Sequence, residues 1–232
     1  MSTNIIVSYD GTANEDDAIA LGRVFARAGA EVSLAYVRHT HEPDHDRETL
    51  AQNDAQELLQ RGASLLGNPH APLHVVTDRS TPEGLRTLAE AERADAIVFC
   101  SDSHTAKGHI AVGNSAERLL DGSQIAIAIA PAGFAAGPVE TSVRQIVAVG
   151  DADGGAAATA EALAGALGAT VAPVVNEDAD LLVVDSRPEA ETGRTSLSSS
   201  ARHLIDIATA PVLVVPRGVT LRFGRATAAA IA

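Results

Sequence analysis

Part of this chain is present twice. Residues 100–131 recur as residues 185–216, and the two segments align without a gap. Each segment indicates the end of a strand, a polar loop containing glycine, a helix and an apolar strand closed by proline, which is typical of the last part of a parallel α/β domain. The sequence therefore predicts two related domains. The matching positions are Ser101 and Ser186, Gly108 and Gly193, Ser115 and Ser200, Ala116 and Ala201, Leu119 and Leu204, Asp121 and Asp206, and Pro131 and Pro216.

Charge and composition exclude several classes of partner. The formal net charge is -13, so the field of the chain repels polyanions, and 3% aromatic residues provide no platform for stacking bases. We therefore expect no nucleic acid partner. No apolar run approaches the roughly 20 residues that span a bilayer. The chain opens directly into a strand pattern and has a single cysteine, Cys100, so we expect a cytoplasmic protein with no membrane association.

The first 131 residues alternate between strand and helix periodicity. Strands are expected at 4–9, 31–37, 73–77, 95–100 and 124–130, and helices at 14–28, 47–66, 80–91 and 114–121. Five strands that alternate with four helices predict a doubly wound, Rossmann-like parallel sheet with strand order 3-2-1-4-5. Ser80, Pro82 and Glu83 predict a capping box at the start of the third helix.

We place the first domain at 1–131, a linker at 132–142, the second domain at 143–217 and a tail at 218–232, whose Ala-rich end we expect to be a frayed helix or disordered. The second domain shows strands at 144–149, 169–175, 179–185 and 211–215 and a helix at 155–167, so about one helix-strand-helix unit is missing. Its second and fourth strands should flank its first strand. Residues 176–180 are too few for a parallel crossover of about a dozen residues or more between them. Either residues 172–180 all form an extended connector, or the second strand is displaced.

Three pieces of the first copy together resemble the universal stress protein family: Asp10-Gly11-Thr12 after the first strand, the loop that ends at Gly113-Asn114-Ser115, and the closing apolar strand before Pro131. Tandem copies are common in that family. The resemblance implies two adenine nucleotide alpha hydrolase-like domains in tandem, the second truncated, whose fifth strands pack the halves into an internal pseudo-dimer. It also implies a stress-response regulatory protein with an unidentified protein partner, and it leaves a homodimer open.

In nucleotide-binding members of the family, an acidic residue after strand one lies near adenine, and a loop with the spacing Gly-two-Gly-nine-Gly-Ser/Thr holds the phosphates. By resemblance, ATP or AMP with Mg²⁺ would bind the first copy. Here Cys100 and Ser103 replace the first two glycines and Asn114 replaces the Ser/Thr, which narrows the backbone cradle. The residues implied are Asp10, Gly11, Thr12, Val37, Ser101, Ser103, Lys107, Gly113, Asn114 and Ser115.

The second copy is expected to bind no nucleotide. Asp185, Pro188 and Ser198 stand at its three glycine places, and Asp151 and Asp153 add carboxylates that would repel phosphates.

Two other functions remain open, and a metal site is a further possibility. A nucleotide-independent interaction module would fill the crevice with side chains. A Mg²⁺-dependent hydrolase would use Asp10, Asp16 or Asp17. No nucleophile motif is present, so we expect no catalytic residues and at most slow ATP hydrolysis. The histidines of the segment 39–46 could hold a metal, although a solvated loop is the more common outcome. The hydroxyl run 195–200 is expected to cap a helix.

Overall fold

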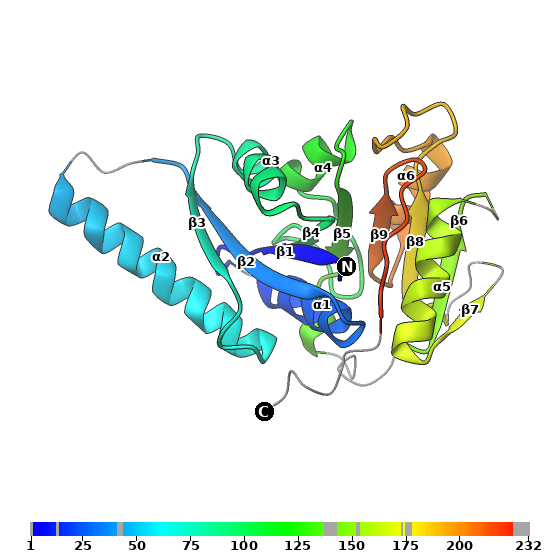
Figure 1. Cartoon of the computed structure of the whole chain (residues 1–232), viewed down its shortest axis with the longest axis horizontal. Coiled ribbons are helices and arrows are strands. Elements are labelled where there is room, and N and C mark those ends of the chain that lie inside the picture. Colours follow the sequence, from blue (N-terminus) through cyan, green and yellow to red (C-terminus); the bar gives the residue numbers. More distant parts are fainter. Residues whose placement is uncertain are drawn as a thin grey trace.

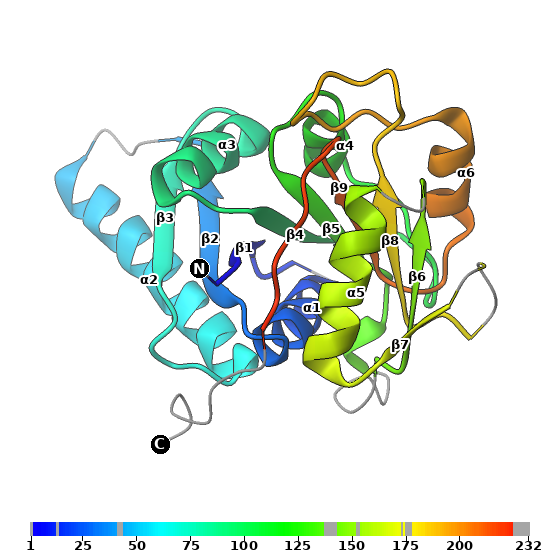
Figure 2. The same ribbon diagram turned by 45° about the vertical axis from the view of Figure 1, so that its right-hand side comes forward.

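The computed structural model of the chain describes residues 2–12, 14–40, 44–136, 143–151, 154–172, 174 and 178–224. Within them, nine strands form one sheet in the order β3-β2-β1-β4-β5-β9-β8-β6-β7 (Figures 1 and 2). The strands are β1 Asn4–Ser8, β2 Glu31–Arg38, β3 Leu73–Thr77, β4 Ala96–Cys100, β5 Ala126–Ala130, β6 Gln145–Val149, β7 Thr170–Ala172, β8 Leu181–Asp185 and β9 Val212–Val215. The helices are α1 Glu15–Arg27, α2 His45–Leu66, α3 Thr81–Glu92, α4 Asn114–Leu120, η1 Phe134–Ala136, α5 Gly155–Leu167 and α6 Ser199–Ile207.

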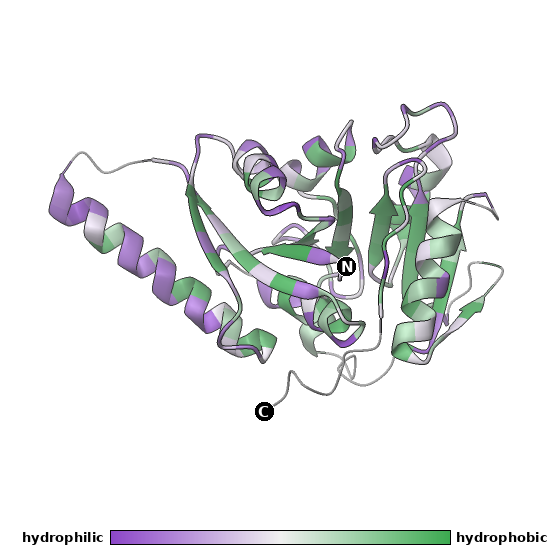
Figure 3. Cartoon of the chain, in the orientation of Figure 1, coloured by the Kyte–Doolittle hydropathy of each residue, from purple (hydrophilic) through white to green (hydrophobic). Residues whose placement is uncertain are grey.

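Helices cover both faces of this sheet. One buried cluster joins the sheet to α1, α2 and α5, and a second joins the opposite face to α3, α4 and α6. The strands are correspondingly hydrophobic in Figure 3, whereas α2 alternates between apolar and polar positions. Full burial of an Ile or Leu side chain contributes about 1.5–3 kcal/mol. Two apolar layers of this kind are what a chain rich in Ala, Val, Ile and Leu can build.

The predicted strand order of the first copy is confirmed. Its five strands are all parallel and follow the order β3-β2-β1-β4-β5. The second copy contributes β9-β8-β6-β7, which are the counterparts of strands five, four, one and two. It has no counterpart of strand three among the described residues, as the shortened sequence predicts.

The halves join through their last strands. β5 and β9 pair antiparallel, with Ile127 opposite Val214 and Ala128 opposite Leu213. This is the pseudo-dimer that the resemblance implies. All four of these side chains are fully buried, so the junction is continuous with the core.

Hydrogen bonds repeat along with the sequence. Gly108 N–H donates to the carbonyl of Ala132 at 2.7 Å, and Gly193 N–H donates to that of Arg217 at 2.8 Å. At the entry to the fourth strand of each copy, an aspartate carboxylate accepts a backbone N–H from the start of the first strand: Asp95 from Asn4 at 2.8 Å and Asp180 from Gln145 at 2.9 Å. The duplicated sequence therefore folds into duplicated loops.

The crossover conflict in the second copy is resolved by a short strand. β7 ends at Ala172 instead of residue 175, yet it pairs with β6 in the expected place. Eight residues, 173–180, then lead to β8, and Asp180 is fixed by its hydrogen bonds to the start of β6. β7 is thus shorter than the strand predicted at 169–175, and residues 173 and 175 of that prediction lie outside the described residues.

The start of α3 also differs from the prediction. α3 begins at Thr81 with proline in its first turn, but Ser80 makes no side-chain capping bond. Its hydroxyl is buried without a hydrogen-bond partner, and Glu83 pairs with Arg86 instead. No capping box forms there.

The beginning of the predicted tail is an ordered strap. After β9, the Leu221 N–H donates to the Thr159 hydroxyl of α5 at 3.0 Å, and Leu221 is buried. The Phe223 ring then stacks on Phe25 of α1 with centroids 5.9 Å apart, and Gly224 N–H donates to the Ala28 carbonyl at 3.1 Å. Residues 219–224, which we call the strap, thus link both halves. The remainder of the predicted tail lies outside the described residues.

The predicted linker is also partly structured. Gly133 and Ala135 N–H groups both donate to the buried carboxylate of Asp17 at 2.7 Å, which fastens η1 onto α1. Residues 137–142 lie outside the described residues. Among the described helices, none is long and apolar enough to cross a membrane.

Candidate functional site

The strand order reverses between β1 and β4 in the first copy and between β6 and β8 in the second. We call the regions at the carboxyl ends of these strands the first and the second crevice. Open α/β sheets bind ligands at such switch points. In the first copy, the loops after β1 and β4 are in contact, because the Asn14 side-chain amide donates to the Asp102 carbonyl at 3.0 Å. The loops that follow β1 and β4 therefore border the same crevice.

Glu15 lies at the first crevice, in the turn between β1 and α1, and no sequence pattern predicted its role there. The Glu15 carboxylate accepts the backbone N–H groups of Asp10 and, at 2.8 Å, of Gly11. Only 5% of Glu15 is exposed. Burial, with the nearby Asp10 carboxylate, raises its pKa to about 8. The amides of the turn between β1 and α1 are thus already used within the protein.

Three predicted site residues belong to this turn. The Asp10 side chain is exposed and accepts the Thr12 N–H at 2.9 Å. Thr12 is exposed as well. Gly11 has a φ of 76°, and a methyl group there would lie 2.5 Å from Leu58 of α2. The close approach of α2 and the left-handed backbone therefore require this glycine.

The side chain of Ser101 does not line the crevice. It is fully buried, and its hydroxyl donates to the Ala130 carbonyl of β5 at 2.8 Å. Its counterpart Ser186 donates to Val215 of β9 at 2.9 Å. This pair of serines ties each loop to the last strand of its copy, which explains why it recurs.

The next predicted residues lie farther along the loop and on β2. Ser103 is exposed, and its hydroxyl lies 3.2 Å from Nδ1 of His104. The Lys107 stem packs along the turn at Gly133, where a methyl group would lie 3.3 Å from Lys107 Cγ. Val37 is buried against Gly84 of α3. Its side chain therefore serves the core.

The start of α4 is the most open part of the first site. Gly113 is the N-cap with φ -69° and ψ 159°, and no side chain caps the helix. A methyl group on Gly113 would meet nothing within 4 Å. Asn114 is exposed and Ser115 half-buried. In the second copy Ser198 holds the matching place, and its hydroxyl accepts the Ala201 N–H at 3.1 Å, which confirms the predicted capping role of the hydroxyl run.

Asp185 occupies the second crevice. Its carboxylate accepts the Ala156 N–H at the start of α5 at 2.8 Å. A methyl group at Gly150 would lie 2.5 Å from this carboxylate, so the glycine is needed for the close approach. Burial raises the pKa of Asp185 although the Ala156 N–H lowers it, and Asp151 raises it further. Hollows of about 300 Å³ and 190 Å³ lie beside Asp185.

The remaining chemistry of the region is limited. Burial, followed by the charges of Glu15 and Asp10, raises the pKa of Cys100 to about 12, so its thiol stays protonated at neutral pH. Within the described ranges, no three His, Cys, Asp or Glu side chains are grouped to hold a metal ion. Residues 41–43 of the histidine segment lie outside those ranges.

The geometry defines a duplicated, Rossmann-like α/β protein with one switch point per copy, and in the second copy the Asp185 carboxylate caps the start of α5. The model of the universal stress protein family matches residues 1–131, more than half of the chain. The chain therefore belongs to the universal stress protein family.

Solved structures agree with this fold over almost the whole chain. A universal stress protein from Archaeoglobus fulgidus DSM 4304 is similar with 17% identity and a TM-score of 0.59, covering 94% of this chain and 100% of that one. A putative universal stress protein from Pseudomonas aeruginosa UCBPP-PA14 is similar with 16% identity and a TM-score of 0.60, covering 94% of each chain. These identities show the shared fold alone. The comparison with curated proteins finds no match.

Proposed function

We propose that this protein is a regulatory universal stress protein that binds an adenine nucleotide, ATP with Mg²⁺ or AMP, in its first copy only. The observation that carries the proposal is the difference between Gly113 and Ser198. The first copy leaves the start of its fourth helix without a side-chain cap, whereas the second copy caps it with a hydroxyl. By resemblance, the proposal includes a cytoplasmic location, a protein partner and at most slow hydrolysis.

The chemistry of the first crevice favours a phosphate at the start of α4. Unpaired N–H groups at a helix start attract anions, and the space above Gly113 is open. Asp10 and Asp102 are exposed carboxylates of the same crevice. Their charge opposes a triphosphate, so a divalent cation would have to accompany ATP. AMP carries less charge and depends less on the cation.

A nucleotide-independent interaction module remains the second candidate. The burial of Glu15 against the amides of Asp10 and Gly11 favours it, because part of the first crevice is filled by the protein itself. In the second copy, Asp185 does the same at the start of α5. The two candidates differ in one measurable property, which is nucleotide affinity.

The test is calorimetric titration of the full chain with AMP and with ATP and Mg²⁺. We expect one nucleotide per chain and at least about a tenfold loss of affinity in Gly113→Asp, since a carboxylate cap competes with phosphate for the helix start. The backbone of Gly113 suits any residue, so this variant should fold. Asn53→Asp, which adds the same charge at an exposed site on α2, is the matched control.

The outcomes separate the candidates. Absence of binding at millimolar nucleotide would leave the interaction module. Two nucleotides per chain would refute the restriction to the first copy. An equal loss in Asn53→Asp would mean that net charge, not the start of α4, controls affinity.

A further inference from the structure

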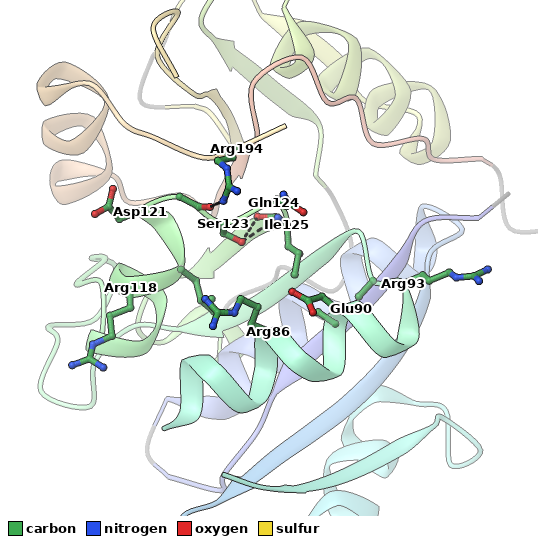
Figure 4. Close-up of a pocket in the computed structure, with 13 residues that line it drawn as sticks. Arg86, Glu90, Arg93, Arg118, Asp121, Ser123, Gln124, Ile125 and Arg194 are labelled. Carbon is green, nitrogen blue, oxygen red and sulfur yellow. Dashed lines mark hydrogen bonds between the residues drawn. The ribbon is translucent and has the colours of Figure 1, made fainter. Parts of the chain in front are cut away.

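A cavity of about 520 Å³ lies at the amino ends of β4 and β5, the opposite end of the strands from the first crevice. It is bounded by α3, by the turn between α4 and β5, and by Arg194 from the second copy (Figure 4). Its volume falls in the range of about 300–1,000 Å³ that is usual for small-molecule sites. Both copies contribute to its wall.

The lining is unusually basic for this chain. Four arginines border the cavity, with only two carboxylates, Glu90 and Asp121, although the whole chain has a net charge of -13. The arginines are Arg86, Arg93, Arg118 and Arg194. Figure 4 shows Arg194 and Arg86 reaching toward the hollow from opposite sides, with Glu90 beside Arg86 and with Arg93 and Arg118 at the outer sides. Positive charge is therefore gathered where the rest of the chain is acidic.

The ion pairs of the inner arginines are weak enough to be exchanged. Arg86 pairs with Glu83 one turn away on α3, and Arg194 pairs with Glu191 at 2.9 Å. These side chains are between 42% and 75% exposed. Exposed pairs of this kind typically contribute about 0–1 kcal/mol. An incoming anion can therefore replace the carboxylates at little cost.

The outer arginines, Arg93 and Arg118, lie at the two outer sides of the lining. In the part of the chain that the structure describes, Arg93 and Arg118 form no ion pair. Arg93 ends α3 with a φ of 52°, a left-handed backbone that glycine adopts more readily.

The two halves of the site are held rigidly together. The Arg194 guanidinium donates to the Gly122 carbonyl at 2.8 Å. The neighbouring Thr195 is fully buried, donates its N–H to Ser123 at 2.7 Å and accepts the Gly122 N–H at 2.9 Å. Arg194 is therefore positioned before any ligand arrives, which reduces the entropy cost of binding.

We propose that this cavity binds a small organic phosphate that carries hydroxyl groups. The guanidinium groups of Arg86 and Arg194 present planar donors that match phosphate oxygens. The Glu90 carboxylate and the exposed Gln124 can accept hydrogen bonds from ligand hydroxyls. Because one inner arginine comes from each copy, the ligand bridges the two copies and stabilises their junction. The site is separate from the proposed nucleotide site.

The test uses fructose 1,6-bisphosphate as the probe on the full chain, followed by amide chemical shifts and by calorimetry. We expect shifts at residues 122–125 and in the second half of α3, and weaker binding at higher salt. Arg86→Gln and Arg194→Gln should each lower affinity by about tenfold or more, since each removes a charge-assisted contact. The double variant Arg47→Gln/Arg144→Gln removes two exposed arginines elsewhere and should bind as the parent does.

Several results would overturn the proposal. One is the absence of shifts at residues 122–125 with millimolar probe, and another is an equal loss of affinity in the control variant. Inorganic phosphate that binds as tightly as the sugar bisphosphate would refute the role of Glu90 and Gln124. Should Arg194→Gln fail to fold, Arg86→Gln still decides, because Arg86 makes only a surface pair. Gly113→Asp should leave this binding unchanged, which distinguishes the cavity from the nucleotide site.

Discussion

Replacing Glu15 with glutamine should remove a large pH dependence of folding stability. Folded Glu15 has a pKa raised from 4.5 to about 8. The folded chain therefore keeps a proton that the unfolded chain releases between these pH values. Stability then falls as the pH rises through this window, and the loss is complete above about pH 8. At about 1.4 kcal/mol per pKa unit, the loss between about pH 5 and pH 9 is about 4 kcal/mol.

Glutamine reproduces the protonated acid. Its carbonyl can accept the N–H groups of Asp10 and Gly11, and its amide can donate to the Asp10 carboxylate. We therefore expect parent and Glu15→Gln to have similar free energies of unfolding near pH 5, with the variant about 4 kcal/mol more stable near pH 9.

Urea unfolding across this pH range measures the difference directly. Glu57→Gln, at an exposed position on α2, is the control and should follow the parent throughout. If the gap between Glu15→Gln and the parent is the same at pH 5 and pH 9, the reasoning about the buried carboxyl is refuted.

Three further predictions test the strap and the second crevice by urea unfolding and nucleotide titration. Gly155→Ala should destabilise the chain by more than about 2 kcal/mol, because its methyl group would collide with the Val219 carbonyl. The control, Gly165→Ala on the same helix, adds a methyl group that meets nothing and should stabilise the chain by about 0.5–1 kcal/mol. Leu221→Ala should cost about 2–5 kcal/mol if the strap is part of the core, and a cost below about 1 kcal/mol would contradict this. Asp185→Ala should not create nucleotide binding, since Ser198 still caps α6; uptake of a second nucleotide would show that Asp185 alone closes the crevice.

Periodicity was sufficient to predict most of the fold. The limits of β3 and α5 agree with the apolar pattern to the residue. The gapless repeat also predicted a duplicated unit, and the loops at Gly108 and Gly193 make matching hydrogen bonds within their own copies.

The candidate site was much less predictable. An acidic residue in the first turn of a helix usually lies at the surface, where its charge interacts favourably with the helix dipole. Nothing in the sequence therefore distinguished buried Glu15 from exposed Asp16. The strap was missed because its apolar residues, Leu221 and Phe223, are too few to show a period. Their partners lie on helices more than about a hundred residues apart in the chain.

The arginine cavity follows from the loss of symmetry between the copies. One wall is α3, and the shortened second copy has no counterpart of this helix among the described residues. The facing wall is the loop at Arg194, whose counterpart in the first copy carries His109 instead. A pair of equal copies would form two such cavities, related by the antiparallel junction of β5 and β9. Truncation leaves one, so the duplicated chain has a single site of this kind, and that site depends on both halves.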